Sequence, residues 1–268
     1  MKQKRFSEEF LQNNHQKCLE LLDKFIEICE KNRIDYYLTE GSALGAVRHK
    51  GFIPWDIHID IHLDIANFLK LDKVMMSENL GNLAWFRPAS RICPLFMFKN
   101  QTTKRKDFDI VQAPDLDITI MGKAPNNRII RWIVMNILFL NIKMFKLKNT
   151  AVKRHFPYNI LRYVSMMLPD SIYFSCLNLF MRKNQEKQAE YYMALTPSFY
   201  GNSELIKTEW IGTEPFYGEF DGRKVRLFKN YHDYLTNRYG DYMKPVVWET
   251  KGEYGGCFYE HKTEKSGK

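Results

Sequence analysis

Residues 52–62 read FIPWDIHIDIH, and residues 41–48, shortly before them, read GSALGAVR. From position 56 to position 62 every second residue is Asp or His, and the residues between them are isoleucines. A β-strand points successive side chains to opposite faces, so this alternation predicts a strand over residues 57–63 with one polar face and one buried face. The potential metal ligands on the polar face are Asp56, His58, Asp60 and His62.

The residues around this strand favour a site for a cation and a phosphate. Gly41 and Ser42 predict a turn, and the following small residues suit the start of a short helix, whose free N–H groups bind phosphate. Arg48 and Lys50 add positive charge in a basic turn. A second predicted strand, residues 116–120, carries Asp117, and two or three carboxylates can hold Mg²⁺ against phosphate oxygens. We expect His62 to be a structural or exposed edge residue.

Composition bounds the class of protein. The chain has 268 residues and 45% hydrophobic residues, which is typical of a folded globular protein, and we expect a single domain over residues 1–268. Its formal net charge of +9 favours anionic partners. No stretch resembles a recognition helix or an RNA-binding sheet motif, so we expect no nucleic-acid partner. The five scattered cysteines and the polar N-terminus favour a cytoplasmic protein, or one at the inner face of the membrane.

Residues 128–190 differ in character from the rest of the chain. They contain long apolar stretches followed by Lys and Arg residues, and we expect a helical insert. Packing of these helices on the main domain is the favoured interpretation. Basic residues flanking Trp132 keep peripheral membrane contact through residues 128–180 as the alternative.

The string from Gly41 to Asp56 closely resembles the signature of the LicD family, the phosphocholine transferases related to fukutin. In that family Gly-Thr-Leu-Leu-Gly-Ala-x-Arg leads to Ile-Pro-Trp-Asp-Asp-Asp-x-Asp. Two further stretches are similar and occur in the expected order. Residues 116–125 resemble the family's Ile-Asp-Ile-Phe-Pro-Leu-Asp segment, and residues 231–235 and 239–243 resemble its Tyr-Asp-x-Tyr-Leu and Tyr-Gly-Asp-Tyr-Met.

The resemblance implies an α+β fold, with a nucleotidyltransferase-like mixed sheet flanked by helices and a helical insert. It also implies transfer of a phosphocholine-like group from a CDP-linked donor to a glycan or glycolipid acceptor, a precursor of lipopolysaccharide, teichoic acid or capsule polysaccharide. The implied cofactor is a divalent metal, Mg²⁺ or Mn²⁺. The implied catalytic residues are Asp60, Asp117 and Asp56, the metal ligands Asp56, His58, Asp60 and Asp117, and the phosphate- or donor-binding residues Gly41, Ser42, Arg48 and Lys50.

The sequence departs from the family pattern at three places. Ile57 and His58 stand where the family has aspartates, and Met121-Gly122 stands where the aspartate that ends the family's second motif would be. Three hypotheses follow. In the first, the enzyme is active with Asp56, Asp60 and Asp117 around the ion and His58 as ligand or base. In the second, it uses a softer metal through His58 and His62. In the third, the site is catalytically weakened and the protein binds donor or glycan in a polysaccharide-assembly complex.

Overall fold

The computed structural model describes residues 7–87, 93–106, 114–149, 158–183, 188–196, 205–244, 248–254 and 257–261. Within these ranges, a seven-stranded mixed sheet runs in the order β1-β2-β5-β4-β3, with β6 beside the second half of β5 and β7 beside β6. Its strands are β1 (Tyr37–Leu38), β2 (Ile59–Asp64), β3 (Leu83–Phe86), β4 (Leu95–Phe98), β5 (Asp115–Lys123), β6 (Tyr191–Ala194) and β7 (Leu205–Lys207). The pair β2–β5 is parallel and the other pairs are antiparallel.

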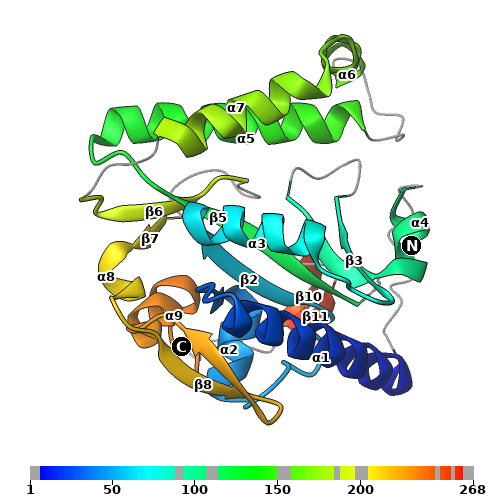
Figure 1. The fold of residues 1–268 in the computed structure, drawn as a ribbon. Helices are drawn as coiled ribbons and strands as arrows, with labels where there is room; N and C mark the ends of the chain where they lie inside the picture. Colours follow the sequence, from blue (N-terminus) through cyan, green and yellow to red (C-terminus); the bar gives the residue numbers. More distant parts are fainter. Residues whose placement is uncertain are drawn as a thin grey trace.

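Helices flank this sheet, which confirms the predicted fold class (Figure 1). They are α1 (Glu8–Lys31), α2 (Glu40–Arg48), α3 (Ile65–Ser77), α4 (Lys99–Lys106), α5 (Arg128–Lys148), α6 (Tyr158–Met167), α7 (Asp170–Lys183), α8 (Thr208–Ile211) and α9 (Tyr231–Tyr239). Two antiparallel strand pairs lie outside the main sheet: β8 (Phe216–Phe220) with β9 (Arg223–Leu227), and β10 (Trp248–Tyr254) with β11 (Cys257–His261).

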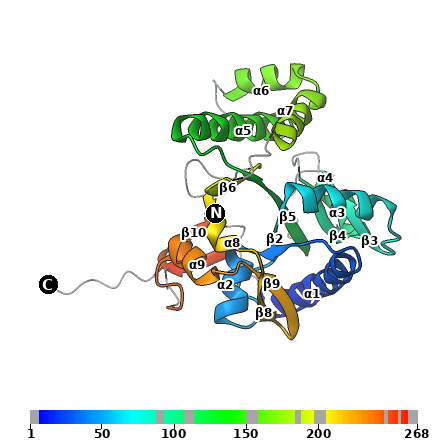
Figure 2. The same cartoon turned by 60° about the vertical axis from the view of Figure 1, so that its left-hand side comes forward.

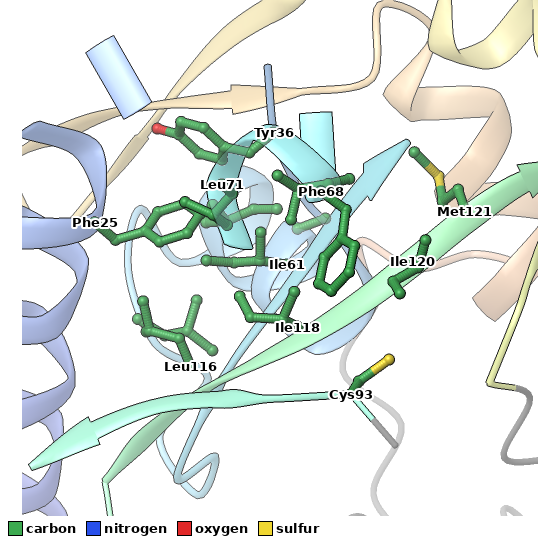
Figure 3. Packing of buried hydrophobic residues seen from close by; sticks show 14 of the residues in the cluster. Phe25, Tyr36, Ile61, Phe68, Leu71, Cys93, Leu116, Ile118, Ile120 and Met121 are labelled. Carbon is green, nitrogen blue, oxygen red and sulfur yellow. The ribbon is translucent and has the colours of Figure 1, made fainter. Parts of the chain in front are cut away.

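The isoleucine face of β2 forms the centre of the core. Ile59, Ile61 and Leu63 are fully buried, and their neighbours Leu116 and Ile118 on β5 are buried as well. Figure 3 shows side chains of α1 and α3 packed over this face, among them Phe25, Phe68 and Leu71. The opposite face of the same two strands is therefore left for the polar residues.

Helix capping explains where α1 begins. The Ser7 hydroxyl accepts a hydrogen bond from the Phe10 N–H, and two glutamates follow in the first turn. Eight residues of the helix are buried, and they recur at helical spacing along one side. The cap at Ser7 and the apolar side together account for this helix.

The predicted helical insert is also confirmed. Helices α5, α6 and α7 form a layer at one end of the molecule in both views (Figures 1 and 2). One side of α5 joins the main core through Met135, Leu138, Ile142 and Phe145. No single helix in the described ranges is long and apolar enough to cross a membrane; α6 and α7 together meet the length and composition test but are bent by 81°.

Two local predictions need correction. Gly41 and Ser42 do not form a turn, because α2 already begins at Glu40. The strand predicted from Ile57 begins only at Ile59.

Candidate active site

Asp60 and Asp117 stand opposite each other on the neighbouring parallel strands β2 and β5. Parallel register places them on the same face, away from the isoleucines. The backbone N–H and the backbone carbonyl of Asp60 are both hydrogen-bonded. Its N–H donates to the Ser42 hydroxyl over 2.8 Å, and its carbonyl accepts from the Thr39 N–H over 3.1 Å. The start of α2 therefore fixes the position of Asp60.

Asp56 lies in a turn before β2 begins. Its N–H donates to the Ile53 carbonyl over 2.9 Å, and its carboxylate accepts from the Ile57 N–H over 2.9 Å. Two side chains of α1 hold the next peptide units: His15 Nε2 lies 2.7 Å from the Asp56 carbonyl, and Asn14 donates to the Ile57 carbonyl. Asp56 is thus positioned by α1, although it is outside the strand.

His58 lies between two of these carboxylates. Its Nδ1 is 3.7 Å from Asp56 Oδ1, and its Nε2 is 3.4 Å from Asp60 Oδ1. Burial alone would lower the pKa of His58, but the Asp60 and Asp56 carboxylates raise that pKa well above its ordinary value. Burial raises the pKa of Asp60 to about 6, with His58 lowering it and Asp117 and Asp56 raising it further. The His58 imidazolium therefore offsets part of the negative charge of Asp56 and Asp60.

The donor set suits a hard divalent cation at Asp60 and Asp117, which present carboxylate oxygens from adjacent strands. Within the described ranges, however, no group of three or more His, Cys, Asp or Glu side chains is arranged to hold a metal ion. The predicted set of Asp56, His58, Asp60 and Asp117 is thus close in space without being assembled around one point. A divalent cation would compete with the charged His58 for the same carboxylates. Metal binding stays a prediction.

The start of α2 approaches Asp56 closely. A Cβ built on Gly41 would lie 2.7 Å from Asp56 Oδ2, nearer than a carbon atom and a carboxylate oxygen normally approach. A carboxylate at a helix N-terminus is stabilised by the helix dipole. Gly41, Ser42, Asp56 and Asp60 are therefore gathered in one place. Phosphate binding by Gly41 and Ser42 stays a prediction.

A second acidic group, Glu40, was missed in the sequence. It begins α2 with a left-handed φ of 48°, which is rare for a residue other than glycine. Three residues of α9 bind its carboxylate: Arg238 Nε at 2.7 Å and the hydroxyls of Tyr234 and Tyr239 at 3.3 Å. We call these four residues the Glu40 clasp. The family resemblance of residues 231–235 and 239–243 singled out the region of α9, but no local sequence pattern indicated that this helix would bind Glu40.

His62 follows Asp60 on the same face, and it is buried rather than at an exposed edge, with 7% of its surface accessible. Its Nδ1 has no hydrogen-bond partner within the described part of the chain. Burial lowers the pKa of His62 to about 3; Arg238 lowers it further and Asp117 opposes this. A neutral imidazole therefore lies beside Asp117 and the Glu40 clasp.

The structure places Arg48 and Lys50 away from Gly41. They lie at and beyond the C-terminal end of α2, a helix of nine residues, which corresponds to a rise of about 12 Å. Arg48 donates to the Tyr242 carbonyl over 2.8 Å, and the Lys50 carbonyl accepts from the Asp221 N–H over 2.7 Å. Arg48 thereby anchors the segment after α9. A role of either side chain in donor binding stays a prediction.

The described part of the chain thus has a mixed sheet with paired carboxylates on adjacent strands beside the start of a helix, as predicted for a nucleotidyltransferase-like fold. Residues 33–90 match the model of the LicD/FKTN/FKRP nucleotidyltransferase domain. The chain is 28% identical over 248 residues to the lipopolysaccharide cholinephosphotransferase LicD of Haemophilus influenzae, a match that covers 85% of this chain and 89% of that protein. An uncharacterized protein of Rickettsia prowazekii is 37% identical over 68 residues, 25% of this chain and 26% of the relative. The chain is therefore similar to LicD proteins over most of its length, and the match to the family's domain model includes α2 and β2.

Proposed function

We propose that this protein transfers phosphocholine, or a similar phospho-alcohol, from a CDP-linked donor to a cell-surface glycan or glycolipid precursor. The observation that carries the proposal is the pairing of Asp60 with Asp117 beside the start of α2. The match to the Haemophilus cholinephosphotransferase over most of both chains supports the choice of phosphocholine and of a lipopolysaccharide-type acceptor. Teichoic acid and capsule precursors are acceptors of the same chemical class.

We assign Asp60 and Asp117 as the main ligands of a divalent metal, Mg²⁺ or Mn²⁺, with Asp56 and His58 beside them. When bound, such an ion neutralises charge on the donor phosphates and favours departure of the nucleotide. The chain's own contribution is positioning, which for phosphoryl transfer supplies much of the catalysis. Ser42 keeps Asp60 in place, and Asn14 and His15 keep the turn around Asp56 in place.

The reaction itself is a displacement at the donor phosphorus that lies next to the alcohol. The acceptor hydroxyl forms a new oxygen–phosphorus bond, the bond to the nucleotide oxygen breaks, and CMP leaves. We assign receipt of the hydroxyl proton to Asp56. Gly41 and Ser42, in the first turn of α2, are assigned to the donor phosphates, which the positive end of a helix stabilises.

The test is release of CMP from CDP-choline by the purified chain, with a lipopolysaccharide core oligosaccharide as acceptor and with Mg²⁺, Mn²⁺ or a chelator. Asp60→Asn and Asp117→Asn are expected to lower kcat by about a hundredfold or more, because each removes charge that acts on the transferring group. Asp23→Asn is the matched control, since that carboxylate pairs with Arg223 on the surface of α1. Equal CMP release by Asp60→Asn and wild type would refute the assignment.

One observation favours a second function, donor binding without turnover in a polysaccharide-assembly complex. His58 already neutralises Asp56 and Asp60 in part, as a catalytically weakened site requires. This alternative predicts calorimetric binding of CDP-choline that survives Asp60→Asn, with no CMP released by either protein. His58→Asp separates the two functions further. It is expected to tighten Mn²⁺ binding about tenfold or more, because it replaces a competing cation by an oxygen ligand.

A further inference from the structure

Helix α5 has a second apolar side that no described part of the chain covers. The outer face, as we call it, comprises Ile129, Trp132, Ile133, Ile137 and Leu140, with exposed fractions between 44% and 69%. These positions recur at helical spacing opposite the buried side of the helix, which carries Met135, Leu138, Ile142 and Phe145. The helix is thus apolar on two sides, and only one of them packs against the protein.

Helix α6, which neighbours α5, also exposes apolar side chains. Met167 is 84% exposed and Tyr163 is 68% exposed, and α6 packs against α5. Both views place α5 and α6 in the layer at one end of the molecule, away from α1, α2 and α9 (Figures 1 and 2). Exposed apolar patches of this kind mark sites of association.

Charge identifies the partner. Residues 128–183 contain ten Lys or Arg residues and one acidic residue, Asp170. That aspartate is already paired with Lys148 at 2.6 Å. Three of the cations are exposed on α5 itself, and we call them the cationic fringe of the outer face: Arg128, Lys143 and Lys146. Helices that lie in the headgroup region of an anionic membrane combine an apolar face with such cations. A tryptophan such as Trp132 on the apolar side is typical of that interface.

A second copy of the chain fits this surface less well. Two outer faces brought together would also bring two cationic fringes together, and residues 128–183 hold no acidic partner for them besides the paired Asp170. An anionic bilayer accepts both features, because apolar side chains enter the acyl boundary while Lys and Arg remain among the phosphates. We propose that the outer face of α5, together with α6, docks the protein on an anionic lipid surface. The proposal does not depend on the transferred group.

The experiment is co-sedimentation of the full chain with vesicles of 30% phosphatidylglycerol in phosphatidylcholine, without nucleotide or acceptor. Binding to pure phosphatidylcholine is expected to be at least about tenfold weaker, because the cationic fringe loses its partner. Trp132→Ser is expected to weaken binding to the anionic vesicles by about tenfold, the effect of losing most of one buried aromatic side chain.

Two methionines give a matched pair. Met167→Asp on α6 is expected to weaken vesicle binding by at least about tenfold. Met76→Asp on α3, where the side chain is 78% exposed, is expected to leave vesicle binding within about twofold. Trp132→Phe keeps the apolar surface, so it is expected to bind normally while losing part of the fluorescence quenching by brominated lipid.

Three results would overturn the proposal. They are absence of binding to the anionic vesicles, equal losses for the two methionine variants, or a concentration-dependent dimer that Trp132→Ser dissociates. The last result would assign the outer face to a second copy. Circular dichroism of each variant keeps a folding defect apart from a binding defect.

Discussion

At the scale of single residues, two glycines of α2 allow other parts of the chain to approach this helix closely. A Cβ on Gly45 would lie 2.4 Å from the Gly51 carbonyl oxygen, which is backbone, whereas a Cβ on Gly41 would meet the end of the Asp56 side chain. In an open helix interior, replacing Gly by Ala stabilises by roughly 0.5–1 kcal/mol. At Gly41 and Gly45 the neighbouring atoms decide whether alanine stabilises or destabilises the fold.

We therefore expect different phenotypes from the two alanine variants. Gly45→Ala should destabilise the fold by about 1–3 kcal/mol, because backbone has to shift. Gly41→Ala should change stability little and lower activity by about tenfold or more, because a displaced Asp56 misaligns the site. Urea unfolding and CMP release measure the two effects. Equal stability losses would contradict the distinction.

His62 should make the stability of the fold depend on pH, with a sign set by its buried environment. Its pKa is about 3 in the folded chain and about 6.5 when unfolded. As the pH falls below about 6.5 the unfolded chain takes up the proton first, so stability is lost progressively until the pH reaches the folded pKa. Between pH 7 and pH 5 this one group should remove about 2 kcal/mol of unfolding free energy.

The measurement is urea unfolding of wild type and His62→Gln at both pH values. The variant has no imidazole to protonate, so its loss between pH 7 and pH 5 should be smaller by about 2 kcal/mol. The pKa of His58 is raised in the fold and so acts with the opposite sign, but it is present in both proteins. Identical pH profiles for the two proteins would show that His62 is not held neutral.

At the scale of elements, the Glu40 clasp joins the start of α2 to α9. Glu40 and Arg238 are largely buried, with side chains 27% and 15% exposed. Removal of one partner leaves the other charge without compensation in a poorly solvated place. The left-handed backbone at Glu40 adds strain that these contacts hold in place.

Arg238→Met is expected to cost about 2–3 kcal/mol of unfolding free energy and to lower kcat, since α2 also positions Asp60. The control is Lys207→Met, which breaks the exposed pair with Glu209 and should change the unfolding free energy much less, because solvent screens a surface ion pair. Denaturant titration measures the stability and CMP release measures kcat. If both variants behave alike, α9 does not hold α2 in place.

Local patterns predict the elements of this chain better than they predict the element boundaries. Alternating isoleucines indicated β2 because the buried face repeats every second residue. They could not show that residues 57 and 58 precede the strand, because that depends on contacts from Asn14 and His15. Nor could they show that α2 begins at Glu40, in a backbone conformation that no side-chain pattern signals.

At the scale of the whole molecule, the insert shares the main core. Leu138 of α5 belongs to the same cluster of buried residues as Leu21 of α1. We therefore propose that residues 1–268 unfold as a single domain. Leu138→Ala and Leu21→Ala should each cost about 2–5 kcal/mol in one transition that circular dichroism and tryptophan fluorescence report together. Separate transitions for the two probes would indicate an independent insert.

The parts of the site that sequence could not predict are those set by long-range pairing. The strand that carries Asp60 and the strand that carries Asp117 can each be predicted from its own local sequence. Their register, with the two aspartates opposite each other, depends on parallel pairing of segments more than fifty residues apart. Arg238 of α9, near the other end of the chain, likewise binds Glu40 and adds to the effect of burial in lowering the pKa of His62.

The distance along the chain between the two sides of the Glu40 clasp has a consequence in time. Arg238 follows Glu40 by 198 residues, so at about 5–20 residues per second a ribosome needs roughly 10–40 s to deliver the second after the first. During that interval β1, α2 and β2 are already synthesised, yet the strained start of α2 lacks the cation that holds it. Between Lys207 and α9 the nascent protein therefore passes through a stage in which every described strand of the main sheet has been synthesised and the candidate site is unfinished. Only a chain synthesised past α9 can complete that site.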